Sequence, residues 1–103
     1  MLFTKKLSLS ISYNGLKDFL NLDNGERIRI EKKLLKLKED PYQGKPLGYE
    51  WFRELKLNGK RIYFLIYDKT QKIGLVAISD KNTQQATIDE IKSKLKEYEE
   101  LFN

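Results

Sequence analysis

Two runs of strand-forming residues, 51–57 and 60–67, are separated only by Asn58-Gly59. Both central residues of a type I′ turn have positive φ, and an Asn-Gly pair accepts this conformation readily. The second run is apolar on both faces, which is typical of a strand with a neighbour on each side. The sequence therefore predicts an antiparallel hairpin whose second strand is central in a sheet.

The predicted turn also determines which residues face each other across the hairpin. Lys56 is expected opposite Arg61, and Glu54 opposite Tyr63. Side chains alternate between the two faces of a strand, so the residues of one face form an exposed polar strip: Phe52, Glu54, Lys56, Arg61, Tyr63 and Leu65. The opposite face is more apolar, and we expect it to be the core face beneath the helices.

Hydrophobic spacing, together with Gly and Pro, predicts the remaining elements. We expect strands at 7–13 and 73–78, helices at 16–22, 26–39 and 87–102, a capping box at Thr87 and a loop at 42–48. The order β-α-α-β-β-β-α predicts a small single α+β domain over residues 1–103. Its sheet should be mainly antiparallel, with the helices packed on one face.

Cysteine and histidine are both absent from the chain. Their absence excludes disulfides, thiolate metal sites, cysteine nucleophiles and Ser-His-Asp triads. It also removes the side chain best suited to proton transfer near neutral pH. Any catalysis must therefore use Lys, Arg, Tyr, Glu or Asp, or positioning of the substrate alone, and we expect neither a metal nor a cofactor.

The net charge of +5 is unevenly distributed along the chain. Residues 1–82 hold 17 basic and 10 acidic side chains, whereas residues 83–103 hold three basic and five acidic ones. A basic body with an acidic tail fits an anionic partner, with nucleic acid the first candidate. A merely solvated charged surface is the alternative interpretation.

The predicted pairing of Lys56 with Arg61 is unusual, because like charges directly opposite each other in a sheet repel. In one interpretation both side chains extend into water, or Glu54 and another carboxylate neutralise them. In the other they form a concave phosphate site, with Arg61 as a planar fork, Lys56 as a point charge and Tyr63 placed to stack on a base. A second basic cluster, at 27–38, is interpreted as the solvated side of a helix.

The stretch LLKLKEDPYQGKPLGYEWFRELKLNGKRIYFLIYD resembles the RelE/ParE superfamily of type II toxins. In that family a helix ends at a Pro, a Gly-Lys-Pro-Leu-like loop follows, and a hairpin similar to RELK…G..RI.Y comes next. The resemblance extends from about Leu7 to Leu101. The segment SDKNTQQATIDEI is similar to the end of phage-derived and HigB-like members.

The resemblance implies a toxin held inactive by a cognate antitoxin. RelE-like members cut mRNA in the ribosomal A site, whereas ParE-like members poison DNA gyrase. Arg61 matches the hairpin arginine of the family, Lys56 matches a hairpin lysine, and Lys81 falls near the basic position after the last strand. Thr87 falls near the catalytic tyrosine of RelE-like enzymes, so the catalytic set is incomplete.

We therefore expect a ribosome-dependent mRNA endonuclease, or mRNA interferase, whose catalytic residues are Arg61, Lys56 and Lys81. The expected RNA-binding residues are Lys56, Arg61, Tyr63 and Lys81. Two alternatives stay open: a ParE-like toxin acting on a protein target, and a toxin-like binding module without activity. The expected partners are an acidic antitoxin, the ribosome and mRNA. The chain has no apolar run of membrane-spanning length and no signal-peptide pattern at its start, so a cytoplasmic location is expected.

Overall fold

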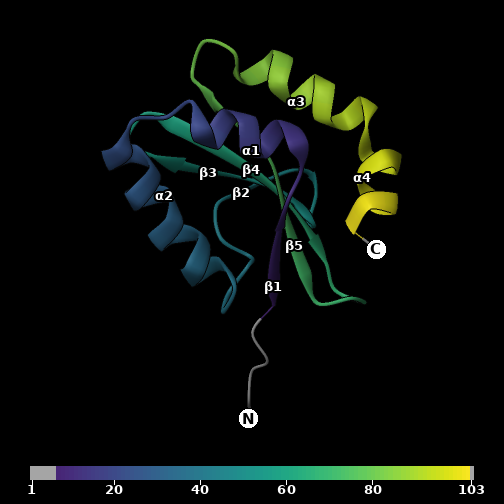
Figure 1. The fold of residues 1–103 in the computed structure, drawn as a ribbon. Helices are drawn as coiled ribbons and strands as arrows, with labels where there is room; N and C mark the ends of the chain where they lie inside the picture. The colour runs from purple at the N-terminus through teal and green to yellow at the C-terminus, as the bar shows by residue number, and fades with distance from the viewer. Residues whose placement is uncertain (1–6, 103) are drawn as a thin grey trace.

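A five-stranded sheet in the order β1-β5-β4-β3-β2 forms the centre of the molecule in the computed structural model, which describes residues 7–102 (Figure 1). Its strands are β1 (Ser8–Ile11), β2 (Lys45–Tyr49), β3 (Phe52–Leu57), β4 (Lys60–Tyr67) and β5 (Lys72–Asp80). β1 is parallel to β5, and every other neighbouring pair is antiparallel. The predicted α+β class with a mainly antiparallel sheet is confirmed. The start of the chain, on which the signal-peptide expectation rests, lies outside the described residues.

The central hairpin has the predicted register. Lys56 lies opposite Arg61 and Glu54 lies opposite Tyr63. Asn58 and Gly59 have φ angles of 49° and 80°, as a type I′ turn requires. β4 lies between β3 and β5, so its predicted central position is also confirmed.

The predicted loop at 42–48 is wrong in part, because β2 begins within it. Pro46 cannot donate a hydrogen bond, but an edge strand needs to pair on one side only and tolerates proline. A bulge separates Pro46 from Tyr49, and Gly48 between them has a φ of 93°. Because proline and glycine are typical of loops, the sequence pattern does not predict a strand here.

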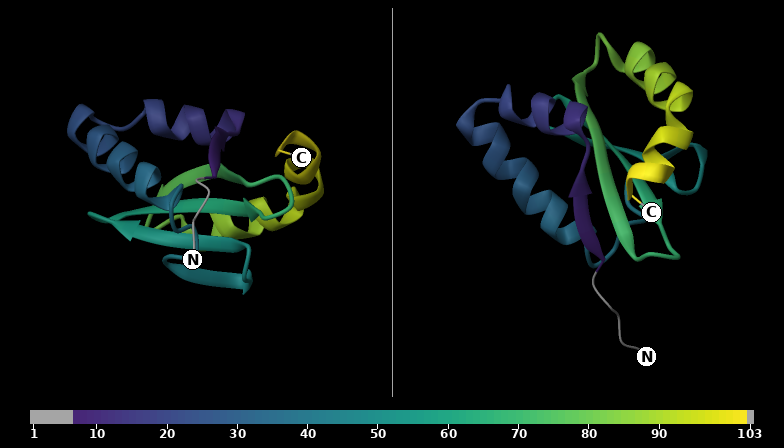
Figure 2. Two further views of the ribbon diagram at one scale, coloured as in Figure 1. Left: turned by 90° about the horizontal axis from the view of Figure 1, so that it is seen from below. Right: turned by 45° about the vertical axis from the view of Figure 1, so that its right-hand side comes forward.

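Helices cover both faces of the sheet, so the expected single covered face is wrong (Figure 2). α1 (Tyr13–Leu20) and α2 (Asn24–Leu37) lie on one face, and α3 (Gln84–Ser93) and α4 (Leu95–Phe102) lie on the other. Residues 61–66 of β4 are all buried, and residues 62–66 contribute alternately to the two cores. The apolar character of β4 on both faces requires a layer above and below the strand, as well as strand neighbours.

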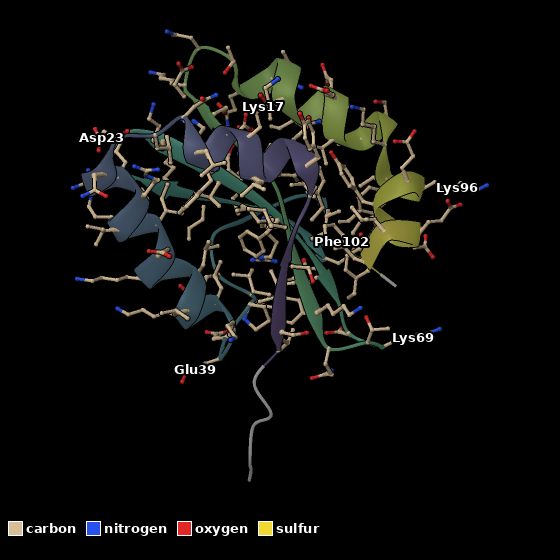
Figure 3. The ribbon with its side chains drawn as sticks, in the orientation of Figure 1. Lys17, Asp23, Glu39, Lys69, Lys96 and Phe102 are labelled. Carbon is tan, nitrogen blue, oxygen red and sulfur yellow. The ribbon has the colours of Figure 1, made fainter. Side chains whose placement is uncertain are left out.

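Side-chain caps begin the two N-terminal helices earlier than predicted. Ser12 Oγ accepts a hydrogen bond from the Gly15 backbone N at 3.0 Å, so Asn14-Gly15 lie inside α1 and do not end β1. Asp23 and Glu26 form a capping box at the start of α2. Figure 3 shows Asp23 at the end of α2 that is nearer α1.

The predicted helix 87–102 is two shorter helices. α3 begins at Gln84, and the chain bends at Lys94 before α4 starts. Thr87 lies within α3 and donates its hydroxyl hydrogen bond to the Thr83 carbonyl oxygen at 2.8 Å. The predicted capping box at Thr87 is therefore wrong, because the helix starts three residues earlier.

Phe102, the last residue of α4, packs against the sheet and holds the C-terminal helices there (Figure 3). Its ring lies against Gly74 of β5, where a Cβ would be only 2.5 Å from the ring. The ring centroids of Tyr67 and Tyr98 lie 5.7 and 6.2 Å from that of Phe102. Glycine at position 74 thus allows α4 to approach the sheet closely.

Candidate functional site

Arg61 lies near the start of β4, on the face that α3 and α4 cover. Its Nη1 donates a hydrogen bond to Oε2 of Glu54 over 3.5 Å, and the other carboxylate oxygen, Oε1, accepts one from Nε2 of Gln84 at 2.6 Å. Only 9% of Arg61 and 3% of Glu54 are exposed. We call Glu54, Arg61 and Gln84 the Glu54 cluster; it connects both strands of the hairpin to α3.

The polar strip that the sequence predicts to be exposed is mostly buried, which corrects that expectation. Tyr63 is completely enclosed, as are Phe52 and Leu65, whereas Lys56 is exposed. The strip would face water only if the helices covered one face of the sheet. The interpretation in which Glu54 neutralises a cation of the hairpin is confirmed for Arg61.

The Arg61 guanidinium has hydrogen-bonding capacity that Glu54 does not use. Its Nε is buried and has no hydrogen-bond partner within residues 7–102. A guanidinium carries five N–H donors in a planar fork, which suits it to bind two oxygens of an anion side by side. The single contact of 3.5 Å with Glu54 is long for a charge-assisted hydrogen bond.

Tyr63 lies beside this pair and shares a hydrogen bond of 2.8 Å with Oγ of Ser79 on β5. Burial raises the pKa of the Tyr63 phenol, and the negative charge of Glu54 raises it further. The phenol is therefore neutral at pH 7. Because the ring is enclosed, Tyr63 cannot stack on a nucleotide base in this arrangement, contrary to the expectation from sequence.

The other predicted site residues lie at the surface or in the core. Lys56 and Lys81 are both exposed, the latter directly after β5. Tyr98 of α4 also lines the core and is buried. The structure thus brings Arg61 and Tyr63 together beside Glu54 and leaves the two lysines solvent-accessible.

A polar cleft of about 300 Å³ lies between α1, the end of β5 and α3. Its lining includes Ser79, the hydrogen-bond partner of Tyr63, together with Lys17, Asp18, Thr83 and Thr87. Figure 3 shows Lys17 on the part of α1 that faces α3. The cleft therefore reaches one end of the Tyr63–Ser79 hydrogen bond.

Sequence reasoning missed Gln84 and Ser79 as partners in this site. Nothing in the segment that contains both residues shows that Gln84 points at Glu54. That contact depends on the start of α3 at residue 84, and the pairing of Arg61 with Ser79 depends on a bulge between β4 and β5. A strand assigned to the whole of 72–80 without this bulge would have placed Ile78, and not Ser79, opposite Arg61.

Metal ligands and membrane helices are not found in the part of the chain that the structure describes. Among residues 7–102, no three or more Asp and Glu side chains form a group able to hold a metal ion. No helix in the same range is both long and apolar enough to cross a bilayer.

Comparison with known proteins identifies the fold. No protein-family model and no curated protein sequence matches the chain. Solved structures do match: a double mutant of E. coli toxin RelE in the free state has a TM-score of 0.72 and 18% identity, with 84% of this chain and 93% of that chain covered. The E. coli RelBE toxin–antitoxin complex gives 0.67 and 22% identity, with 72% and 95% covered. The chromosomal ParDE system of P. aeruginosa gives 0.55 and 15%, with 73% and 96% covered.

Proposed function

We propose that this chain, whose fold is that of the RelE/ParE toxins, is the toxin of a type II toxin–antitoxin pair and cleaves mRNA on the ribosome. The observation that carries the proposal is Arg61, which matches the hairpin arginine of the family and lies on the central strand with a hydrogen-bonding capacity that is only partly used. In the proposed reaction the 2′-hydroxyl loses its proton to water and attacks the adjacent phosphate, and the bond from phosphorus to the 5′-oxygen of the next nucleotide breaks, so that this oxygen leaves as a hydroxyl with a proton from water. Arg61 then stabilises the charge that develops on the phosphate oxygens.

Lys56 and Lys81 are proposed to attract the RNA backbone, because both are exposed and positively charged. Ordinary carboxylates and lysines have pKa values of about 4 and about 10, so neither is suited to proton transfer at neutral pH. Positioning by the ribosome must therefore supply much of the rate. We expect little cleavage of free RNA.

The proposed antitoxin would bind to the outer side of α1 and α2. Tyr13, Leu16 and Leu20 follow each other at helical spacing on α1 and are 78%, 42% and 56% exposed. Exposed apolar stripes of this kind typically mark interaction surfaces. α2 adds exposed Ile28 and Leu35 among its basic residues, which favours a partner with apolar and acidic side chains.

Toeprinting of mRNA on translating ribosomes tests the proposed activity. Added protein should produce new primer-extension stops within the codon of the A site, at the 5′ end of the downstream fragment, and Arg61→Ala should abolish them. Intact mRNA at saturating protein would exclude the endonuclease. Co-expression with a small acidic protein encoded next to this chain should yield a stable complex, and Leu16→Asp should weaken it; no complex would argue against the antitoxin.

A second candidate function is a non-nucleolytic toxin that acts on a protein target, or a toxin-like binding module. The Glu54–Arg61 contact favours it, because an arginine that already has a carboxylate partner is less available to phosphate. Thr87 at the place of the catalytic tyrosine favours it as well. Growth arrest with intact mRNA would support this candidate over the first.

A further inference from the structure

Both oxygens of the Glu54 carboxylate are engaged, and they are engaged by different elements. Oε2 receives Nη1 of Arg61 from β4, and Oε1 receives Nε2 of Gln84 from α3. The carboxylate is enclosed at the point where α3 begins to cross the hairpin. Glu54 is thus a buried anion held between the proposed phosphate-binding residue and the helix that covers it.

Carboxylate and phosphate offer the same feature to a guanidinium, namely negatively charged oxygens that accept hydrogen bonds. We propose that Glu54 is an internal anion that takes the place of the RNA phosphate on Arg61, and that Gln84 holds it there. The RNA phosphate can then bind Arg61 only when the Glu54 carboxylate has moved away from the guanidinium. The proposal rests on the proposed function and specifies how its site is regulated.

The start of α3 is suited to such a movement. Thr83, at the N-cap position of α3, makes no capping hydrogen bond with its side chain. Its backbone N and Oγ1 donate instead to Oδ1 of Asp80, at 3.1 and 3.3 Å, which attaches the start of α3 to the end of β5 and not to the hairpin. α3 is held to the sheet further along, by the buried residues Ile88 and Ile91. The first turn can therefore separate from the hairpin while the rest of α3 stays packed, and Gln84 is the first residue of that turn.

The geometry of the contact between Glu54 and Arg61 also favours its replacement by a phosphate. A buried ion pair repays the loss of hydration only when its geometry is good and its remaining donors are satisfied. Here the contact is long, at 3.5 Å, and the Arg61 Nε is unpartnered within the described residues. The two non-bridging oxygens of an incoming RNA phosphate could accept hydrogen bonds from two N–H groups of the guanidinium side by side, which would satisfy more of it than Glu54 does.

Binding of a short fluorescent single-stranded oligouridine to the full chain, followed by anisotropy at constant ionic strength, tests the proposal. Glu54→Gln removes the internal anion and keeps the side-chain shape. Glu50→Gln is the matched control, because it also removes one negative charge, but from an exposed side chain paired with Arg53. We expect Glu54→Gln to bind RNA more than about tenfold tighter than Glu50→Gln, since a nearby like charge no longer opposes the phosphate.

Two further variants keep the test decisive. Gln84→Ala leaves the ion pair and the net charge intact, so it provides the test if Glu54→Gln does not fold; it should also bind RNA several-fold tighter than wild type. Glu54→Gln combined with Arg61→Ala should lose the gain. Equal affinities for Glu54→Gln and Glu50→Gln, or for Gln84→Ala and wild type if Glu54→Gln does not fold, would overturn the proposal.

Toeprinting separates this proposal from the proposed function. If wild type and Glu54→Gln both leave ribosomal mRNA intact while the affinity gain appears, the internal anion is supported and the endonuclease is excluded. If wild type cleaves mRNA and Glu54→Gln binds RNA no better than Glu50→Gln, the endonuclease stands and the internal anion is excluded.

Discussion

Removal of the Phe102 ring should destabilise the protein strongly, although Phe102 lies close to the end of the chain. The side chain is 3% exposed and lies against Gly74, where no Cβ separates the ring from the β5 backbone. A buried Phe covers roughly 150–250 Å² of apolar surface, which at about 25 cal/mol per Å² corresponds to about 4–6 kcal/mol. Measured Phe→Ala costs in cores are about 3–5 kcal/mol.

The expected cost of Phe102→Ala lies at the lower end, at about 3 kcal/mol, because α4 is terminal and can detach locally without global unfolding. For a domain of this size the cost corresponds to a Tm decrease of about 10–20 °C. Leu101→Ala is the matched control, since Leu101 is its neighbour and is 60% exposed. That control should stay within about 0.5 kcal/mol of wild type.

Urea unfolding followed by circular dichroism and by the fluorescence of Trp51, the one tryptophan of the sequence, measures both variants. The midpoint of Phe102→Ala should decrease, and the dependence on urea should decrease slightly as well, because a detached α4 leaves less surface to be exposed on unfolding. If Phe102→Ala unfolds at the same urea concentration as Leu101→Ala, α4 does not pack on β5. The covering of the Arg61 site by α3 and α4 would then be refuted as well.

Three further predictions concern the helices and the buried tyrosines. Gly15→Ala should destabilise the protein by about 1–2 kcal/mol in thermal unfolding, because a Cβ would lie 2.6 Å from the Leu75 carbonyl oxygen. Gly25→Ala is the control, since a Cβ has room there, and it should be neutral or slightly stabilising. Equal effects of the two substitutions would refute the close approach of Gly15 to β5. Asp23→Ala should cost about 1 kcal/mol by loss of the N-cap, and an unchanged Tm would show that the cap is not formed. Burial raises the pKa of the Tyr67 phenol, so the folded state resists its ionisation. The free energy of unfolding should therefore fall as the pH rises above about 10, where the unfolded state ionises. Tyr67→Phe should reduce this fall, and an identical pH profile for the variant and wild type would contradict the prediction.

The sequence was sufficient to predict the central hairpin, including its register, because the Asn58-Gly59 turn and the strand period together leave one solution. It also indicated the mainly antiparallel sheet. It did not reveal β2, since Pro46 and Gly48 are typical of loops and are tolerated here only at a sheet edge. A local sequence pattern does not indicate whether a strand lies at the edge of a sheet.

The placement of the C-terminal helices on the second face has a similar explanation. An apolar run such as 61–66 indicates that a strand is buried, but not which helix covers each face. The predicted exposure of Arg61 and Tyr63 was wrong for this reason alone. The sequence was therefore sufficient to place Arg61 beside Glu54 and Tyr63 on one face of the hairpin, whereas the burial of Arg61 and the contact of Glu54 with Gln84 required the three-dimensional arrangement.

Controlled expression in growing bacteria tests most directly the central claim that this chain is a toxin acting through Arg61. Wild type should arrest growth, co-expression of the acidic protein encoded beside it should restore growth, and Arg61→Ala should allow growth while accumulating as folded protein. Arg53→Lys, a change at a buried arginine of the same hairpin that lies outside the Glu54 cluster, serves as the control and should still arrest growth. Normal growth with abundant soluble wild type would contradict the claim of toxicity, and arrest by Arg61→Ala would contradict the assigned site.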